Sequence, residues 1–328
     1  MGFIKYLISC GLFSLLLLKE ATCWSDEGHM LISAIAYEGL DDNEKKILTK
    51  ILENYKEDND FNNHVYAAVW PDHIKYYEHP IDTTKRMDGI DLMDRWHYIN
   101  VPYNPTHIDL DMYHKEYYKT TDNSLTMTRR IFHNLKSFEK KKNYGSYFSY
   151  NFQLRYFIHV FGDMHQPLHT TTFFNKNFIQ GDYGGTAINV SYNHRTEKLH
   201  HLCDCVFHAR DKRWPHATVE EVTSDARDLM KTYPPEYFGE RIDNGMDENE
   251  FLGYIVEDSY EQAVKHIYSG FPFETLNRHT SYDLSNAYVI NLKKVLNEQI
   301  ALGGYRLTRY LKIMLANVPD DLLQTGTA

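Results

Sequence analysis

The segment FIHVFGDMHQPLH (residues 157–169) constrains the fold more than any other, because it places three histidines and an aspartate in an otherwise apolar helical pattern. A buried ionisable side chain without a partner costs several kcal/mol or loses its charge. His159 and Asp163 are four residues apart and therefore project from one helix face. Pro167 stops the helix, and His169 follows at the bend. The interior of the protein must therefore supply partners for these groups.

Further histidine–aspartate pairs occur elsewhere in the chain. His200 and Asp204 are also four residues apart, in the helical segment KLHHLCDCVF. Asp72 in AAVWPDHIKY and His97 in RWHYIN form another possible pair, and His29 lies near the expected start of the mature chain. Neutral imidazoles and carboxylates are ligands that zinc takes in proteins. The set therefore indicates a metal site.

Simpler explanations exist for single members of this set. An isolated histidine–aspartate pair is more often a surface ion pair than a metal site. For His29, which lies on an apolar helix, the alternative is a hydrogen-bonded histidine in the core. We expect four other histidines to be surface residues in ion pairs: His64, His73, His165 and His201.

The N-terminus has the pattern of a secretory signal peptide over residues 1–23. Lys5 precedes an apolar run at residues 6–18, and small residues stand at the −3 and −1 positions of a cleavage site after Cys23. The run is short for a membrane span, although a retained signal anchor is the alternative. Cleavage would leave residues 24–328, which carry no membrane tail or lipid anchor signal. We therefore expect a secreted protein with no membrane anchor.

Apolar residues recur with helical spacing through most of the mature chain. The predicted helices are residues 28–40, 126–141, 152–166, 220–231, 251–268, 284–302 and 305–316. Gly303 and Gly304 are expected to separate the last two. TAINVSYN and NHRTEK predict one small β-hairpin, and residues 232–250 a loop. The expected fold class is all-α, as a single mostly helical domain over residues 24–328 with one small β-hairpin.

The net charge and the cysteine content argue against two classes of protein. The formal net charge of −10 argues against broad capture of nucleic acid by a basic face. It leaves room for a small site in which bound cations supply the positive charge. After cleavage, two cysteines remain of four, Cys203 and Cys205, so the protein is not a disulfide scaffold. Three states are open for these two cysteines. A disulfide between them would close a tight, strained ring; otherwise they are free thiols or form disulfides with another chain.

These segments together resemble the zinc-dependent S1/P1 nuclease family, which is related in fold to zinc-dependent phospholipase C. FIHVFGDMHQPLH matches the family's H-x3-D-x5-H box, and DYGGTAINV resembles its D-x-G-G-N strand. LHHLCD is similar to N-L-H-x-x-W-D, while VWPD and WHYIN match the W-x-D and H-[FY]-I segments. Mature members begin with tryptophan, as this chain would after cleavage before Trp24. The pattern runs through most of the mature chain.

The resemblance implies three zinc ions per chain, held by imidazoles, carboxylates and the new chain start. The ligands implied for the first are Asp72, His97, His159 and Asp163. Those for the second are the amino and carbonyl groups of Trp24, with His29 and a bridging Asp163. Those for the third are His169, His200 and Asp204.

The resemblance also implies hydrolysis of single-stranded DNA and RNA to 5′-phosphate products by a zinc-activated water, together with 3′-nucleotidase activity. Asp72 and Asp163 would be catalytic, with Lys75 as a cation near the phosphate. Tyr98 matches the aromatic that stacks a base. The simpler alternatives are a solvated surface lysine at position 75 and a core aromatic at position 98.

The sequence departs from the family pattern at three positions. Asn100 stands where members commonly have an aspartate that contacts the base edge. Thr186 replaces an asparagine near the scissile phosphate, and Cys203 replaces a tryptophan beside the third metal. These changes affect substrate preference rather than the metal ligands.

Two other functions compete with a nuclease. A phospholipase C-type phosphodiesterase shares the fold and the N-terminal tryptophan, but it usually has glutamate at the position of Asp204. A secreted zinc-binding protein without turnover is the second alternative. Structural zinc sites are usually closed Cys/His cages, which argues against it. The expected substrates remain single-stranded nucleic acids and 3′-nucleotides.

Overall fold

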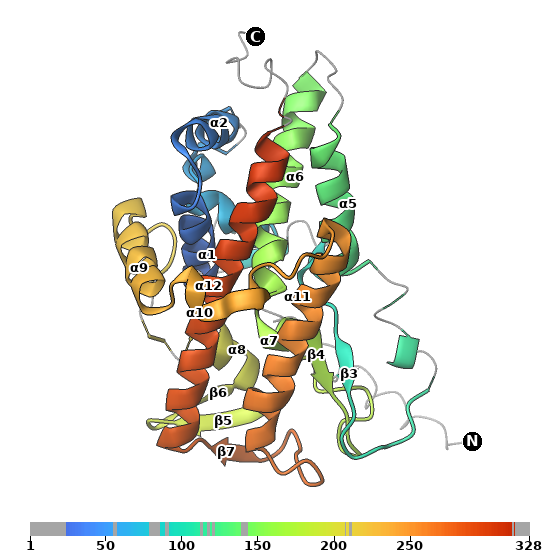
Figure 1. Cartoon of the computed structure of the whole chain (residues 1–328). Coiled ribbons are helices and arrows are strands. Elements are labelled where there is room, and N and C mark those ends of the chain that lie inside the picture. The colour runs from blue at the N-terminus through green and yellow to red at the C-terminus, as the bar shows by residue number, and fades with distance from the viewer. Residues whose placement is uncertain are drawn as a thin grey trace, which may run out of the picture.

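The computed structural model of the chain is shown in Figure 1. It describes residues 24–318 apart from 55–57, 79–85, 89–91, 112–113, 117–118, 120–121, 139–143, 207, 210–211 and 317. The predicted signal peptide, residues 1–23, lies outside the described residues.

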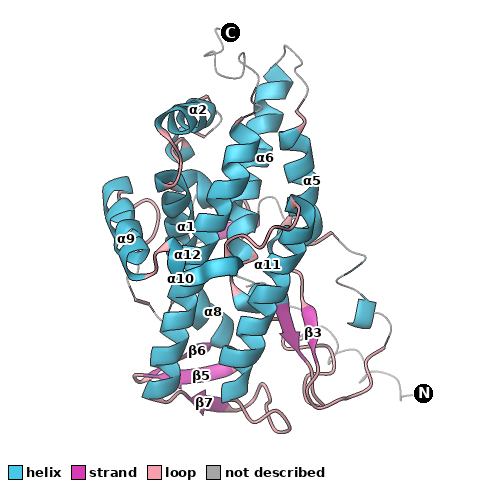
Figure 2. Cartoon of the chain, in the orientation of Figure 1, coloured by secondary structure: helices cyan, strands magenta, loops and turns pink. Residues whose placement is uncertain are grey.

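Helices make up most of the described chain, which confirms the predicted all-α class (Figure 2). The α-helices are α1 (Asp26–Glu38), α2 (Asp42–Glu53), α3 (Trp70–His73), α5 (Ser124–Lys136), α6 (Tyr144–Asp163), α7 (Pro167–Thr170), α8 (Leu199–Asp204), α9 (Val219–Thr232), α10 (Pro235–Phe238), α11 (Glu248–Gln262) and α12 (Asn286–Leu315). Shorter 3-10 helices are η1 (Asn59–Phe61), η2 (Tyr66–Ala68), η3 (Asp94–His97), η4 (Gly239–Arg241) and η6 (Tyr268–Gly270), and η5 (Ala263–Ile267) is a π-helix.

Local hydrogen bonds explain where some of these helices begin. In α2, the Asp41 carboxylate accepts from the backbone N–H of Glu44, and the Glu44 carboxylate accepts from that of Asp41, both at 2.8 Å. This capping box satisfies two amide groups that have no partner inside the helix. Thr218 and Glu221 make the same arrangement at the start of α9. Helix α2 was missing from the sequence prediction, although its capping box was visible there.

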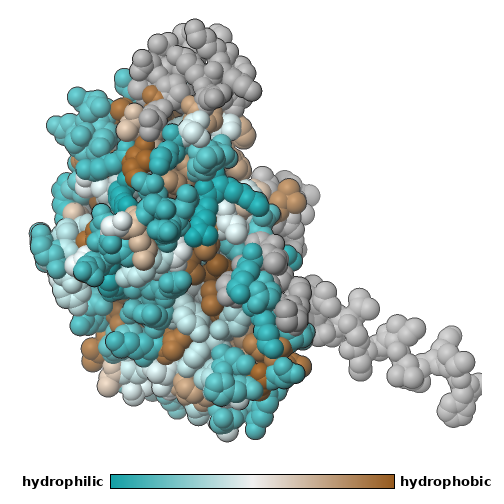
Figure 3. Space-filling model, turned by 45° about the vertical axis from the view of Figure 1, so that its right-hand side comes forward, coloured by the Kyte–Doolittle hydropathy of each residue, from teal (hydrophilic) through white to brown (hydrophobic). Residues whose placement is uncertain are grey.

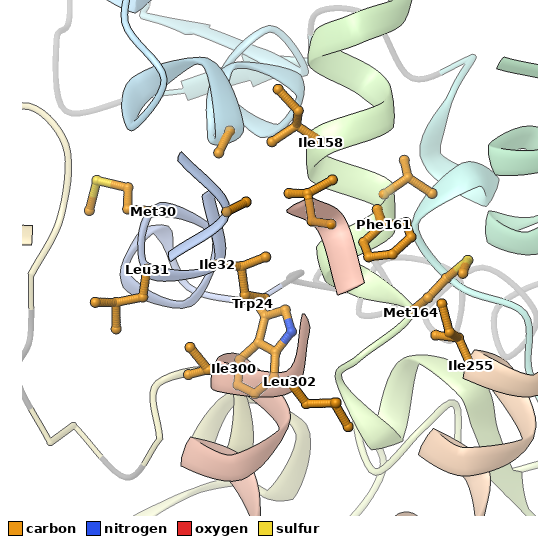
Figure 4. Packing of buried hydrophobic residues seen from close by; sticks show 14 of the residues in the cluster. Trp24, Met30, Leu31, Ile32, Ile158, Phe161, Met164, Ile255, Ile300 and Leu302 are labelled. Carbon is orange, nitrogen blue, oxygen red and sulfur yellow. The ribbon is translucent and has the colours of Figure 1, made fainter. Parts of the chain in front are cut away.

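The core surrounds α6, the long helix that carries His159 and Asp163. Helix α6 packs against α5, α1 and α12 (Figure 1). Figure 4 shows the Trp24 indole near Ile32 of α1 and Ile300 and Leu302 of α12. Trp24 is only 1% exposed, and its indole N–H donates to the carbonyl of Gly162 at 3.0 Å. The first residue of the expected mature chain is therefore anchored one position before Asp163.

Helix α12 runs without interruption through Gly303 and Gly304, so the predicted break was wrong. A Cβ atom at Gly304 would lie 2.4 Å from Cγ2 of Ile35, and one at Gly303 would lie 3.1 Å from Cγ of His165. The glycines therefore allow α12 to pack closely against α1 and the end of α6. Burial of the surrounding apolar surface outweighs the roughly 1 kcal/mol that each glycine costs within a helix.

The predicted hairpin is present, and the structure adds strands to it. β5 (Asn189–Tyr192) pairs antiparallel with β6 (Arg195–Lys198), and β7 (Ser281–Asp283) pairs parallel with β5. Two-stranded pairs join β1 (Tyr76–Glu78) to β2 (Arg86–Asp88) and β3 (Val101–Tyr103) to β4 (Thr171–Phe173). The parallel β3–β4 pair aligns the segment after His97 with the segment after His169. It therefore brings together residues far apart in the sequence.

The face shown in Figure 3 is largely hydrophilic, with small scattered hydrophobic patches. Among the described residues, no helix combines the length and the hydrophobicity needed to cross a membrane. The predicted loop at residues 232–250 is interrupted by the short helix α10 and by η4, and it ends earlier than predicted because α11 begins at Glu248.

Gly304→Ala is expected to lower the free energy of unfolding by about 1–3 kcal/mol, because the methyl group would overlap Ile35. Gly253→Ala in α11 is the matched control. Its added methyl group meets only the end of the flexible Arg129 side chain. That variant should be neutral or gain up to about 1 kcal/mol. Urea denaturation of both variants tests this, and equal effects would contradict the role assigned to Gly304.

Candidate metal centre

The structure brings the predicted histidines and carboxylates together in three buried or largely buried groups. Within each group, one potential ligand atom per residue lies within 4.8 Å of the others. The groups are Asp72 with His97 and His159; His29 with His159 and Asp163; and His169 with His200 and Asp204. They come from α1, α3, η3, α6, α7 and α8. The side-chain members of the predicted ligand set therefore converge from six separate elements.

Asp163, at the end of α6, lies at the centre of these groups and is fully buried. Its Oδ2 is 3.0 Å from Nδ1 of His97 and 3.3 Å from Nε2 of His159. Its Oδ1 is 3.4 Å from Nε2 of His29 and 3.3 Å from Nδ1 of His169. One carboxylate thus presents different oxygens to different histidines, which is the geometry that a bridging ligand requires.

Backbone carbonyls orient three of the imidazoles. In each case Nδ1 donates to a carbonyl oxygen, so that Nε2 carries the lone pair that a metal would use. The pairs are His159 with Ala68 (2.6 Å), His169 with His97 (2.8 Å) and His200 with Gly184 (2.6 Å). Such contacts to ligating histidines are usual in metal sites.

The glycine pair of DYGG positions the third group. Gly184 has a φ of +61°, and a Cβ atom there would lie 2.4 Å from the carbonyl oxygen of Leu168. Only glycine fits this turn without strain, and the turn presents the Gly184 carbonyl to His200. Asp182 holds the loop by accepting from the N–H groups of Phe173 and Gly185 at 2.8 and 2.9 Å. The motif therefore supports a candidate ligand through its backbone.

Gln166 is a site residue that the sequence prediction missed. Its side-chain N–H donates to Oδ1 of Asp204 at 2.6 Å, and its Oε1 accepts from the backbone N–H of Leu168 at 2.6 Å. It therefore fixes the carboxylate of the third group relative to the bend at Pro167. Its position within the histidine-rich segment, three residues after Asp163, was the available signal.

The charges of the centre shift the pKa values of its members strongly. Burial by itself raises the pKa of Asp163, but His159, His169 and His29 outweigh it and hold this pKa well below its usual range. Burial, followed by His29, lowers the pKa of His159 well below its ordinary value. Burial also lowers the pKa of His169, but Asp163 and Asp204 outweigh it and raise the value to about 9. The buried carboxylates thus attract positive charge.

The donor set fits bound metal ions. Both ring nitrogens of His29 and Nε2 of His169 are buried and lack a hydrogen-bond partner among the described residues. Buried polar atoms are normally satisfied, so each such atom needs an explanation. Imidazole nitrogens beside carboxylate oxygens are donors that zinc accepts, and a cation would use the unsatisfied nitrogens.

Lys75 is buried rather than solvated. Its exposure is 9%, and its Nζ donates to Oδ1 of Asp72 at 2.8 Å. Burial by itself raises the pKa of Asp72, but Lys75 and the histidines His159 and His97 outweigh it and lower the value. The simpler alternative, a solvated surface lysine, is therefore wrong at this position, and the role of Lys75 near a phosphate stays a prediction.

A cavity of about 240 Å³ opens beside the third group. Its lining includes all three predicted substrate-side residues, Tyr98, Asn100 and Thr186. The Oγ1 of Thr186 is buried and has no hydrogen-bond partner among the described residues. Tyr183 also lines the cavity, is 40% exposed and has a φ of 57°. The sequence prediction missed Tyr183, although it lies next to the glycine pair.

The predictions for the remaining histidines and cysteines had mixed outcomes. His165 is fully buried, and its Nδ1 donates to the Phe161 carbonyl at 2.8 Å, so the surface prediction was wrong. His64 stacks on Tyr37 at 3.7 Å, and burial lowers its pKa to about 4. His201 and His73 do lie beside carboxylates, with Glu197 at 2.7 Å and Asp26 at 3.4 Å respectively. Cys203 and Cys205 are free thiols, both buried.

A mostly helical protein with buried histidine–aspartate groups beside a cavity has the features of a metal-dependent hydrolase. The family model for S1/P1 Nuclease matches residues 24–316. The chain belongs to the S1/P1 nuclease family.

Known relatives share little sequence identity with this chain but span most of it. "Endonuclease 5" of Arabidopsis thaliana is 22% identical over 315 residues, which cover 92% of this chain and 94% of the relative. "Endonuclease 4" of the same plant is also 22% identical over 315 residues, which cover 92% of this chain and 93% of the relative. "Nuclease S1" of Aspergillus oryzae is 27% identical over 173 residues, or 49% of this chain and 53% of the relative. The family and these relatives support a nuclease.

Removal of metal by a chelator is expected to lower the melting temperature of the protein that begins at Trp24, and added divalent metal should restore it. A site held at about 100 times its Kd contributes about 2.7 kcal/mol. Asp163→Asn should reduce this response, because it removes a charged oxygen shared by the groups. His133→Ala, at an exposed position on α5, should respond as wild type does. Differential scanning calorimetry measures the effect, and a melting temperature insensitive to chelator would contradict the assignment.

Proposed function

We propose that this protein is a secreted, zinc-dependent endonuclease that hydrolyses single-stranded DNA and RNA to 5′-phosphate products and also removes 3′-phosphates from nucleotides. Residues 24–328 form its catalytic domain after removal of residues 1–23 as a signal peptide. The observation that carries the proposal is the shared carboxylate of Asp163, which lies 3.0–3.4 Å from four imidazoles close to a cavity.

The ligand sets follow the groups already described, with three zinc ions per chain. Asp163 would belong to both of the first two ligand sets, and Trp24 would contribute its amino and carbonyl groups once the preceding bond is cut. The indole of Trp24 is held at Gly162, which supports a position for this residue beside Asp163. When bound, the zinc ions would activate water and neutralise the charge of the phosphodiester.

The chain's own residues would bind and orient the substrate around these ions. Lys75 neutralises negative charge near Asp72, to which it already donates at 2.8 Å. Lysine supplies this charge without the bidentate geometry of arginine. Thr186 offers a hydroxyl without a hydrogen-bond partner among the described residues, a suitable donor to a phosphate oxygen. Both residues would therefore interact with the phosphate group of the substrate rather than with its base.

The cavity is suited to one unpaired nucleotide. Tyr98 follows His97 directly, so that a base stacked on its ring would place its sugar and phosphate near the candidate ligands. Stacking contributes about 1–3 kcal/mol and tolerates any base. Asn100 carries both a donor and an acceptor and would meet the base edge. Only an unpaired base exposes its face, which favours single strands.

His159→Ala is expected to abolish hydrolysis of single-stranded DNA, RNA and 3′-nucleotides, because His159 belongs to two of the groups. The matched control, His133→Ala, removes an exposed imidazole and should keep full activity. Hydrolysis is measured with metal removed and then restored with zinc. Full activity of His159→Ala, or phosphatidylcholine cleavage without cleavage of nucleic acid, would refute the proposal.

Tyr98→Ala is expected to raise KM for single-stranded substrates roughly 5- to 150-fold, which corresponds to about 1–3 kcal/mol of lost stacking. Tyr98→Phe keeps the aromatic face and should remain within about threefold of wild type. Steady-state kinetics on a short oligonucleotide separate the two variants. Equal KM values for both would indicate that the ring does not stack a base.

A further inference from the structure

Helix α8 (Leu199–Asp204) and its C-cap residue, Cys205, carry two interleaved pairs of side chains that could bind metal. His200 and Asp204 belong to the centre described above. His201 and Cys205, each one residue later, are also four apart and are rotated by about 100° around the helix axis. The second pair therefore faces away from the centre and belongs to a different environment.

His208 completes a group with this second pair. One potential ligand atom each from His201, Cys205 and His208 lies within 4.8 Å of the others. Nε2 of His201 is 3.7 Å from Sγ of Cys205, and the rings of His201 and His208 are 5.6 Å apart. In tetrahedral zinc sites, bonds of 2.0–2.1 Å to nitrogen and 2.3 Å to sulfur place these atoms about 3.6 Å apart. The observed separation leaves room for one ion between them.

Glu197 of β6 supports both imidazoles. Its Oε2 is 2.7 Å from Nδ1 of His201, so that Nδ1 donates to it and Nε2 presents its lone pair towards Cys205. Nε2 of His208 is 3.2 Å from both carboxylate oxygens. A carboxylate that accepts from the outer nitrogen of a histidine is the usual support of a metal ligand. It also adds negative charge beside the cation.

The group is accessible from solvent, whereas its sulfur is protected. The side chains of His201 and His208 are 41% and 22% exposed, while Cys205 is 6% exposed. A thiolate with two imidazoles selects zinc and related transition metals rather than magnesium or calcium. A metal ion can therefore reach the group from solvent, and the sulfur and two imidazole nitrogens are donors that suit zinc.

We propose that His201, Cys205 and His208 bind one zinc ion, oriented by Glu197, at a site separate from the three groups around Asp163. Such an ion would connect the end of α8 to the chain that follows, and the hydrogen bonds of Glu197 would link it to β6. It would steady the helix that presents His200 and Asp204 from the other side. The site does not depend on the proposed nuclease function.

Cobalt(II) is the probe that distinguishes this site, because only a thiolate ligand gives sulfur-to-cobalt charge-transfer absorption in the near ultraviolet. The groups around Asp163 contain no cysteine, so they cannot contribute to that band. The protein beginning at Trp24, kept reduced with a phosphine, is stripped of metal and titrated with cobalt. Wild type should show the band and lose it when zinc is added in excess over all the sites and displaces the cobalt.

Two cysteine variants give matched comparisons. Cys205→Ala should lose the band and bind one equivalent of metal less than wild type. Cys203→Ala removes a fully buried thiol outside the group and should keep both the band and the metal content. His208→Gln should weaken or shift the band without loss of the fold, which circular dichroism verifies.

The proposal would be overturned if the wild-type protein gave no charge-transfer band, if the band survived in Cys205→Ala, or if it disappeared only in Cys203→Ala. A Cys203–Cys205 disulfide in the secreted protein would also overturn it. Because these readouts do not use substrate, they remain informative whether or not the protein cleaves nucleic acid.

Discussion

The structure depends on the burial of one carboxylate, Asp163, among four imidazoles. An isolated buried carboxylate would be strongly unfavourable, and so would neutral histidines with unsatisfied nitrogens. Both oxygens of Asp163 face histidines at 3.0–3.4 Å, and both ring nitrogens of His29 and Nε2 of His169 lack a hydrogen-bond partner among the described residues. This imbalance is what bound cations would relieve. The strongest electrostatic constraint in the fold is thus also its clearest indication of function.

Backbone carbonyls hold three of the candidate ligands in place. Carbonyls of Ala68, His97 and Gly184 accept from the outer nitrogens of three imidazoles. The parallel β3–β4 pair and the close packing of α12 at Gly304 keep distant segments in register. Rigid support of this kind is what a metal site requires, because ligand positions must hold to a fraction of an ångström.

Much of the architecture was predictable because it is local. Apolar periodicity identified α1, α5, α6, α9 and α11, and alternation identified the β5–β6 hairpin. The prediction failed where tertiary contacts override local preference. Gly303 and Gly304 indicate a helix break in isolation, but they are the contact points of α12 with α1 and α6. The polar side chain of His165 suggests exposure, yet packing keeps it fully buried.

The sequence alone determined which side chains are available for metal chemistry, because histidine and aspartate four residues apart in a helix must share a face. It also determined the family, since the boxes and their order need no coordinates. Only the tertiary structure decided that Asp163 faces four histidines, that Gln166 and Gly184 support the third group, and that Tyr183 joins Tyr98 at one cavity. Most of these relations join residues more than ten positions apart, and their distances follow from how the elements pack.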